Sequence, residues 1–251
     1  MLSPIIYSYK SGMRSAKMIA NALRCKNHYP GSGYVYNHND LIVNWGTGSP
    51  IGVPQSARIL NKYTAIKKSA NKKTSFRLFE QHGITIPERT TSIQIAREWI
   101  NAGEVVFCRQ ILDGQNGEGV VLAKEENQLV SSLLYTKYVR NRDEFRVHVF
   151  KGEPIFWTMK ELDRNAPSGT EHYIKSGEYW SMSWVDNIPE ICKEQAIKAT
   201  AALGLDFAAV DIGMNYYRNT AYVFETNTAP GGFGLITLNR YVQAIKRELN
   251  E

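Results

Sequence analysis

Residues 207–232 read FAAVDIGMNYYRNTAYVFETNTAPGG and hold two apolar runs on either side of a polar YRN at 217–219. A reversal of the chain through a three-residue loop at 217–219 pairs Tyr216 with Thr220. The stretch therefore predicts a β-hairpin whose two strands are largely buried.

The same register sets Asp211 directly opposite Glu225. Side chains opposite each other on paired strands have Cβ atoms about 4.5–5.5 Å apart. Residue alternation places Asn227 on the Glu225 face. Two neighbouring carboxylates repel each other unless a cation is present, and a few oxygen ligands suit Mg²⁺, which also takes water and phosphate oxygens. We therefore predict that Asp211, Glu225 and Asn227 hold a metal in a nucleotide-using enzyme.

The composition is that of a globular protein that can bury a full core, with 251 residues and 43% hydrophobic residues. It contains no run of 18 apolar residues, and its first residues do not resemble a secretory signal, so we expect a cytoplasmic protein without a membrane segment. Three widely spaced cysteines, Cys25, Cys108 and Cys192, indicate reduced thiols.

The net charge of +6 favours anionic ligands such as nucleotides, acidic peptides or nucleic acid. Several of the lysines recur at helical spacing over 62–73, where a solvated helix face is the default interpretation. Aromatic residues are scattered and form no stacking motif, so nucleic acid is a minor hypothesis.

Hydrophobic periodicity predicts an α/β chain. A strand at 5–7, a helix at 16–23 and a strand at 41–45 form a small lobe over residues 1–60, which presents the loop 46–50 at a strand end. One long helix is expected over 62–81, ending before Gly83. The remaining predictions are strands at 105–108, 119–123, 133–139, 143–150 and 154–160 and helices at 190–203 and 235–249. The polar segment 161–179 is long enough to suggest a functional loop.

The segment 109–119 lies between two predicted strands and holds Gly114, Gly117 and Gly119. Glycine lets backbone amides approach phosphate oxygens, but a plain glycine-rich turn is an equally good interpretation of this segment alone. Two charged residues, Glu144 and Arg146, share one face of the next strand. They could bind a nucleotide, or they could form an ion pair on a solvated face. Lys160 likewise is either a phosphate contact or an edge lysine.

No histidine pair has metal-binding spacing, and no serine or cysteine nucleophile motif occurs. Taken in order, however, the segments from about residue 61 to 234 resemble the ATP-grasp superfamily, specifically its carboxylate–amine ligases of the D-alanine ligase and ribosomal-protein glutamate ligase type. The resemblance is strongest at Asp211 and at the Glu-x-Asn of Glu225 and Asn227, followed by Pro230-Gly231. It implies an ATP-grasp fold with two α/β lobes, 61–139 and 140–251, that clamp ATP, beside the short lobe 1–60.

The resemblance also implies roles for individual residues. Arg146, Lys160 and Arg164 would stabilise the transferring phosphoryl group and the oxyanion. Nucleotide contacts would come from Lys72, Arg109, Gly114, Gly117, Gly119, Lys137, Tyr138, Val139 and Glu144, with backbone groups of 137–139 at the adenine. One departure concerns Arg109, since the family usually has a lysine on this strand.

The implied reaction joins a carboxylate to an amine through an acyl phosphate, with ATP and one or two Mg²⁺ ions (or Mn²⁺) and release of ADP and phosphate. The substrates are not fixed by the sequence, and candidates are an amino acid, a peptide or a protein tail. Two alternatives stay open. One is an ATP-grasp-type small-molecule kinase, and the other is a non-catalytic protein that binds nucleotide or nucleic acid.

Overall fold

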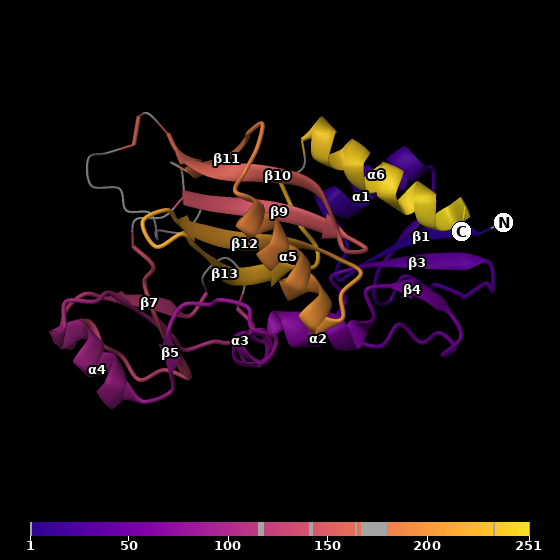
Figure 1. The fold of residues 1–251 in the computed structure, drawn as a ribbon. Coiled ribbons are helices and arrows are strands. Elements are labelled where there is room, and N and C mark those ends of the chain that lie inside the picture. Colours follow the sequence, from indigo (N-terminus) through magenta and orange to yellow (C-terminus); the bar gives the residue numbers. More distant parts are fainter. Residues whose placement is uncertain are drawn as a thin grey trace.

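The computed structural model describes residues 2–114, 118–140, 143–163, 165–166, 180–232 and 234–250, and it arranges their strands in three sheets (Figure 1). The first sheet has the order β2-β1-β3-β4, the second β5-β8-β6-β7 and the third β11-β10-β9-β12-β13. Helices separate and cover these sheets, so the described chain is a mixed α/β fold, as the sequence predicts.

The first sheet is parallel and is formed by β1 (Ser3–Ser8), β2 (Asn27–His28), β3 (Asp40–Trp45) and β4 (Arg58–Leu60). Helix α1 (Arg14–Leu23) packs beside α6 (Leu235–Asn250), and both lie along this sheet (Figure 1). Their shared core includes Trp45 and Tyr241 together with Phe150 and Phe207 from the third sheet. The two ends of the chain are thereby joined in one hydrophobic core.

The second sheet is antiparallel and contains β5 (Arg89–Thr90), β6 (Val106–Arg109), β7 (Val120–Ala123) and β8 (Leu134–Lys137). Helix α4 (Ile93–Asn101) covers one face and packs on Cys108 and Tyr135. A short 3-10 turn, Glu126–Gln128, follows β7. The opposite face of the sheet carries Arg109, because Arg109 alternates with the buried Cys108.

The third sheet is antiparallel and contains β9 (Asp143–Phe150), β10 (Glu153–Leu162), β11 (Trp180–Trp184), β12 (Phe207–Asn215) and β13 (Thr220–Asn227). Helix α5 (Glu190–Leu203) lies across one face (Figure 1). The β9–β10 hairpin turns at Lys151 and Gly152, which both have positive φ angles of 48° and 79°. Such a two-residue turn matches the twist of paired strands, and the sequence predicts its position.

The expected single helix over 62–81 is two helices, α2 (Tyr63–Ala70) and α3 (Lys72–Gln81). The break falls at Asn71, whose backbone is extended (φ −88°, ψ 108°) and whose side chain accepts a hydrogen bond from the Thr74 amide at 2.9 Å. Asparagine competes well as a helix N-cap, so it starts a new helix here. Glycine stops α3 as predicted, with Gly83 at φ 66°.

The predicted hairpin of residues 207–232 forms, but its loop is one residue longer than predicted. Asn215, not Tyr216, pairs with Thr220. The register then shifts between Asp211 and Ile212, which pair with Glu225 and Val223. Phe224 is therefore the extra residue of a β-bulge. Because the bulge compensates for the longer loop, Asp211 still lies opposite Glu225, as predicted.

The sequence interpretation left out the four edge strands β2, β4, β5 and β11, and it also left out helix α4. Helix α4 is capped by Ser92, whose side chain accepts from the Ile95 amide. The division into 1–60, 61–139 and 140–251 stays a prediction. All three cysteines are free thiols, as expected.

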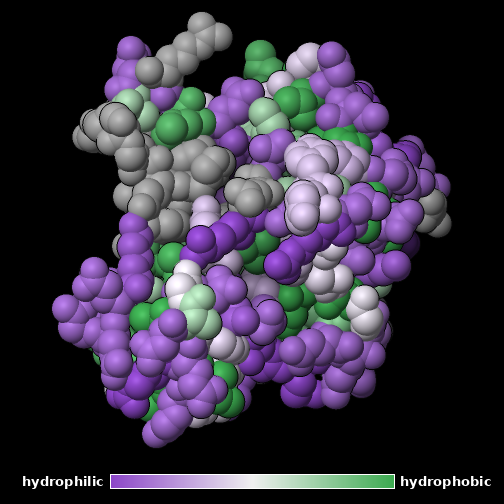
Figure 2. Space-filling model, turned by 60° about the vertical axis from the view of Figure 1, so that its left-hand side comes forward, coloured by the Kyte–Doolittle hydropathy of each residue, from purple (hydrophilic) through white to green (hydrophobic). Residues whose placement is uncertain are grey.

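Within the described ranges, none of the helices combines the length and the apolar character needed to cross a membrane. Hydrophilic side chains dominate the face shown in Figure 2, where hydrophobic residues form small groups between them.

Candidate active site

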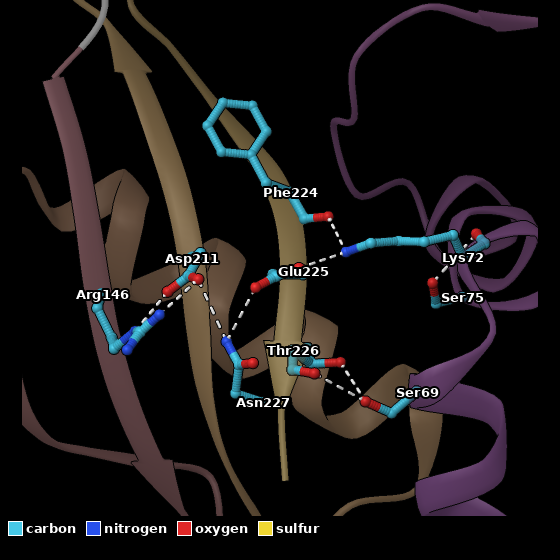
Figure 3. A network of polar contacts seen from close by, with 9 residues as sticks. All are labelled: Ser69, Lys72, Ser75, Arg146, Asp211, Phe224, Glu225, Thr226 and Asn227. Carbon is cyan, nitrogen blue, oxygen red and sulfur yellow. Dashed lines mark hydrogen bonds and ion pairs between the residues drawn. The ribbon is translucent and has the colours of Figure 1, made fainter. Parts of the chain in front are cut away.

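Two carboxylates meet on the face of the third sheet that is opposite to α5 (Figure 3). Asp211 comes from the middle of β12, and Glu225 lies directly opposite it on β13. We call these two residues the acid pair. Asn227 lies between them, with its amide nitrogen 3.2 Å from Asp211 Oδ2 and 3.3 Å from Glu225 Oε1. The three predicted metal ligands therefore do converge, because Asp211 pairs with Glu225 and alternation places Asn227 on the Glu225 face.

A guanidinium group holds Asp211 from the neighbouring strand. Arg146 lies opposite Asp211 on β9 and donates from Nε to Oδ1 at 2.6 Å and from Nη2 to Oδ2 at 2.8 Å. This two-point contact fixes both the orientation of the carboxylate and that of the guanidinium. Sequence reasoning left open whether Arg146 binds phosphate or an acid, and in this structure it binds an acid.

An ammonium group holds Glu225 from the other side. Lys72, at the start of α3, donates to Glu225 Oε2 at 2.8 Å and to the Phe224 carbonyl at 3.0 Å (Figure 3). Its side chain is only 14% exposed. The expectation of a solvated lysine face therefore fails at Lys72, because this lysine crosses from helix to sheet.

Opposite charges and burial shift the titration of the acid pair in different directions. The Lys72 ammonium lowers the pKa of the Glu225 carboxyl far below its usual range. Burial raises the pKa of Asp211 to about 6, although Arg146 counteracts the rise. Burial also lowers the pKa of Lys72. The site is thus a compact network in which two cations neutralise two acids.

These residues fit a small divalent cation by the chemistry of their donor set. Two carboxylates and one amide group approach a common point. The carboxylates offer oxygen there directly, and Asn227 would offer its amide oxygen after a half-turn of the amide group, whose nitrogen now faces the acids. No cluster of three or more His, Cys, Asp or Glu occurs among the described residues, so the candidate set depends on the Asn227 amide. The ion pairs also show that repulsion within the acid pair does not by itself require a metal, because Arg146 and Lys72 already balance the charge. The metal assignment stays a prediction.

A third cation reaches the site from the second sheet. The guanidinium of Arg109 is close enough to Glu225 and Lys72 for charge interactions with both, and it lies over the Phe107 ring with Cζ 5.8 Å from the ring centroid. Its Nε is buried and has no hydrogen-bond partner. A buried donor without a partner is costly unless a ligand supplies an acceptor. This atom therefore fits a nucleotide phosphate oxygen.

The glycine-rich segment has steric reasons for two of its glycines. A Cβ on Gly119 would lie 2.7–3.0 Å from Ile111 atoms, and Gly119 also has φ 65°. A Cβ on Gly114 would lie 2.7 Å from the Glu118 carbonyl oxygen. Close packing within the loop thus accounts for both residues, and their contact with phosphates stays a prediction. Gly117 lies outside the described residues.

Two other candidates pair with each other. Lys160 on β10 contacts both carboxylate oxygens of Glu144 on β9, at 3.3 and 3.5 Å. Their side chains are only 15% and 16% exposed. They lie on the same sheet face as Arg146, one pleat away from it, so they extend the polar surface around the acid pair.

The predicted adenine hinge ends strand β8. The Lys137 side chain points to the α4 face, where it contacts Glu88 Oε2 at 2.9 Å and the Trp99 ring at 5.0 Å. The amides of Lys137 and Tyr138 donate to the carbonyls of Glu88 and Val105. Contacts of Lys137, Tyr138 and Val139 with adenine stay predictions. Arg164 lies outside the described residues.

Sequence reasoning missed a second link between α2 and β13. Ser69 Oγ is 2.6 Å from Thr226 Oγ1 and 3.0 Å from the Thr226 carbonyl oxygen, which accepts its hydrogen bond (Figure 3). With Lys72, this contact anchors the helix pair beside the acid pair. A serine on the buried side of an amphipathic helix was the available signal.

The structural comparisons identify the fold. A structure of the ATP-grasp ligase PsnB with a minimal precursor has a TM-score of 0.70 at 11% identity and covers 99% of this chain and 100% of that chain. D-alanine–D-alanine ligase from Bacillus anthracis has a TM-score of 0.66 at 13% identity, with 98% of both chains covered. The predicted fold class is thereby confirmed.

Sequence relatives agree with that fold, although no family model matches the chain. A protein named probable alpha-L-glutamate ligase from Pasteurella multocida (strain Pm70) is 28% identical over 194 residues, which cover 70% of this chain and 58% of that protein. One with the same name from Klebsiella pneumoniae (strain 342) is 30% identical over 201 residues, covering 71% and 62%. The chain has the ATP-grasp fold, and its sequence is similar to these ligases.

This ATP-grasp chain spans between 35% and 62% of the length of the curated relatives that it matches. Its likeness to them therefore covers a common core and leaves part of each relative unmatched. Within this ATP-grasp core, the acid pair lies on the large sheet, and Arg109 approaches it from the second sheet.

Proposed function

We propose that this ATP-grasp chain is an ATP- and Mg²⁺-dependent ligase that joins a carboxylate to an amine. The observation that carries the proposal is the meeting of three elements at the acid pair. The third sheet supplies Asp211, Glu225 and Asn227, α3 supplies Lys72, and the second sheet supplies Arg109 with a buried, unpartnered Nε. An anionic ligand bridged to a cation between these elements would satisfy all of them.

The reaction needs positioning more than a protein nucleophile. A carboxylate oxygen attacks the γ-phosphorus of ATP, the bond to the β,γ-bridging oxygen breaks, and ADP leaves. An amine nitrogen then attacks the acyl phosphate carbon, phosphate leaves, and the amine loses a proton. Phosphoryl transfer of this kind is accelerated chiefly by orientation and by neutralisation of charge. This agrees with a site rich in cations and without a nucleophile motif.

Each residue has a proposed task in this scheme. Asp211, Glu225 and Asn227 would hold the metal, and Mg²⁺ would supply neutralisation of the charge on the phosphates. Arg109 would donate to a phosphate oxygen. Arg146 is held at the edge of the acid pair, where it would stabilise the oxyanion, and Lys160 would add positive charge one pleat away.

The substrate class follows from the relatives only as a proposal. Several are named alpha-L-glutamate ligases, and some structural neighbours are complexes with precursor peptides. We propose that the carboxylate or the amine belongs to an amino acid, a peptide or a protein tail. We place the reaction in the cytoplasm, where ATP is available and thiols stay reduced.

The test is thermal unfolding of the wild type and of Glu225→Gln, with and without ATP and Mg²⁺. A ligand at 100 times its dissociation constant stabilises the folded state by about 2.7 kcal/mol. We expect a shift that requires both ATP and Mg²⁺ and that is lost in Glu225→Gln. Glu161→Gln is the matched control, because it changes an exposed glutamate away from the acid pair.

Turnover then separates the reaction classes. With hydroxylamine as the amine, a ligase forms ADP and a hydroxamate only when a carboxylate is present. A kinase would form ADP without free phosphate and without hydroxamate. A protein that only binds nucleotide would show the thermal shift and no ADP with any acceptor.

A further inference from the structure

A row of side chains crosses the third sheet from the acid pair to its free edge. Asp211 on β12 lies opposite Arg146 on β9, Arg146 lies opposite Thr158 on β10, and Thr158 lies opposite Trp184 on β11. Residues directly opposite on antiparallel strands share one face of the sheet. All four side chains therefore lie on the face of the acid pair.

The Thr158 hydroxyl in this row has no partner. Its Oγ1 is buried and makes no hydrogen bond, and it is one of only three such side-chain atoms reported among the described residues. The other two are Arg109 Nε, beside the acid pair, and Thr47 Oγ1. A buried hydroxyl without a partner has lost its hydrogen bonds to water, and this costs free energy unless a ligand supplies a partner.

The guanidinium of Arg146, which lies opposite Thr158, also has N–H groups that Asp211 does not use. Arg146 commits Nε and Nη2 to Asp211. Among the residues that the structure describes, its Nη1 has no acceptor. Guanidinium carries five N–H donors in a planar fork, so an Asp-bound Arg146 still offers hydrogens toward a ligand. Lys160 is less suited to this task, because Glu144 already binds it.

Beyond Thr158 the row becomes apolar. Trp184 is 57% exposed. Met182 is on the same edge strand, β11, opposite Lys160 of β10, and is 39% exposed. Adjacent strands are about 4.8 Å apart, so Trp184 lies one strand spacing from Thr158 and about 10 Å from Arg146. Polar donors thus come first along the row, and an exposed apolar edge follows.

We propose that this row is the binding site of the carboxylate substrate. The carboxylate lies over Arg146 and Thr158, next to the acid pair, and accepts hydrogen bonds from Nη1 and from the threonine hydroxyl. The group that bears the carboxylate extends across the sheet and packs on Trp184. The site therefore selects carboxylates with an aromatic or bulky aliphatic group two or three bonds away. This assignment deepens the ligase function proposed above and rests on it for the identity of the ligand.

The test is calorimetric binding of 3-phenylpropionate and of propionate to the full chain with AMPPNP and Mg²⁺. We expect the wild type to bind 3-phenylpropionate about tenfold more tightly or better, because only this probe reaches Trp184. Trp184→Ala should remove the preference between the two probes. Tyr217→Ala, which truncates an aromatic side chain that is 94% exposed in a distant turn, is the matched control and should keep it.

Thr158→Val removes the hydroxyl and keeps the shape. We expect it to weaken both probes about tenfold, since a hydrogen bond to a charged group is lost, and we expect Thr158→Ser to restore binding. With hydroxylamine as the amine, the loss should fall on KM for the carboxylate more than on kcat. The affinity of Thr158→Val for AMPPNP should stay unchanged. If Thr158 had a purely structural role, the variant would weaken the binding of AMPPNP together with that of the two probes.

The outcomes separate this site from the ligase reaction. The predicted binding pattern without any hydroxamate would sink the ligase reaction and retain the carboxylate site. Hydroxamate formation that is indifferent to Thr158 and Trp184 would retain the reaction and overturn the site. Failure of the wild type to bind either probe, or equal binding of both, would also overturn the site.

Discussion

Lys72 donates to the carbonyl of Phe224 at 3.0 Å, and Phe224 is the bulged residue that brings Glu225 opposite Asp211. The same ammonium donates to Glu225. One lysine therefore holds both the irregular backbone of β13 and the carboxylate that the irregularity positions. Bulges often occur next to active sites, where they re-aim a side chain.

Lys72→Met should loosen this arrangement. We expect a loss of about 1–2 kcal/mol in the free energy of unfolding, because a bulge carbonyl and a carboxylate lose a donor. The expected loss of stability is small because the Glu225 side chain is 42% exposed, so that solvent screens its ion pair with Lys72. Urea denaturation measures it. Lys73→Met, at the next and exposed position, is the control, and an equal effect of the two variants would contradict the role of Lys72.

The pairing of Asp211 with Glu225 was predictable, but the longer loop and the bulge that produce it were not. The prediction came from the turn, because a loop at 217–219 sets Asp211 opposite Glu225. Alternation alone would place Glu225 on the face of Val223, which packs in the core under α5, and the bulge at Phe224 turns Glu225 to the face of Asp211. The loop length depends on local turn energetics, and nothing in the residues around Phe224 predicts a bulge there. A three-residue loop with regular pairing and a longer loop with a bulge place the acid pair identically.

The ion pairs of the site lay beyond sequence reasoning. The resemblance placed Arg146 and Lys72 near a nucleotide, but strand order decides that Arg146 lies beside Asp211. The start of α3 at Lys72 depends on the Asn71 cap, which the lysine-rich periodicity of 62–73 conceals. A single sequence can show that Ser69 lies on the buried side of a helix, but it carries no signal that Thr226 is its partner.

Arg109→Met should weaken nucleotide binding without weakening the fold. The guanidinium is buried with an unpartnered Nε, so its removal leaves no broken hydrogen bond at that atom. Loss of a charge-assisted contact to phosphate costs about 1.5–3 kcal/mol, or roughly tenfold to a hundredfold in affinity. The measurement is calorimetry of AMPPNP with Mg²⁺, together with urea denaturation of the free protein.

Arg109→Lys tests the departure from the usual family lysine, and we expect it to recover most of the affinity because the charge is kept. Arg97→Met, on the outer helix α4, serves as the control for loss of an arginine. Unchanged affinity in Arg109→Met would remove Arg109 from the nucleotide site.

His148 should make the fold sensitive to acid. Burial, with a smaller effect of Arg146, lowers the pKa of His148 from 6.5 to about 3 in the folded protein. The unfolded chain then binds a proton below pH 6.5 that the folded protein does not take up until about pH 3. Stability should fall by up to about 1.4 kcal/mol per pH unit as the pH drops through this window, and this residue contributes no slope above it.

His148→Gln should flatten that part of the profile, because glutamine does not titrate. The variant should also lose some stability at neutral pH, since Nδ1 is 3.0 Å from the Tyr241 hydroxyl in the core. Urea denaturation between pH 4 and 8 measures both effects. The exposed His38 provides the control, and His38→Gln should keep the wild-type slope. Equal slopes in the wild type and His148→Gln would contradict a buried neutral imidazole.

Gly119→Ala should destabilise the second sheet more than Gly103→Ala. Both glycines have positive φ angles, 65° and 80°, so alanine pays a similar backbone cost at each. Only at position 119 does the new Cβ meet atoms, because Ile111 Cβ and Cγ1 would lie 2.8 and 2.7 Å away, whereas position 103 is open. Overpacking of this kind costs about 1–3 kcal/mol beyond the backbone term. Urea denaturation of the two variants gives the difference directly, and equal midpoints would show that the segment before β7 yields to the added methyl group. The double variant Gly119→Ala with Ile111→Gly removes both of these Ile111 atoms, so, compared with Ile111→Gly alone, it should recover the excess if the clash with Ile111 is the cause.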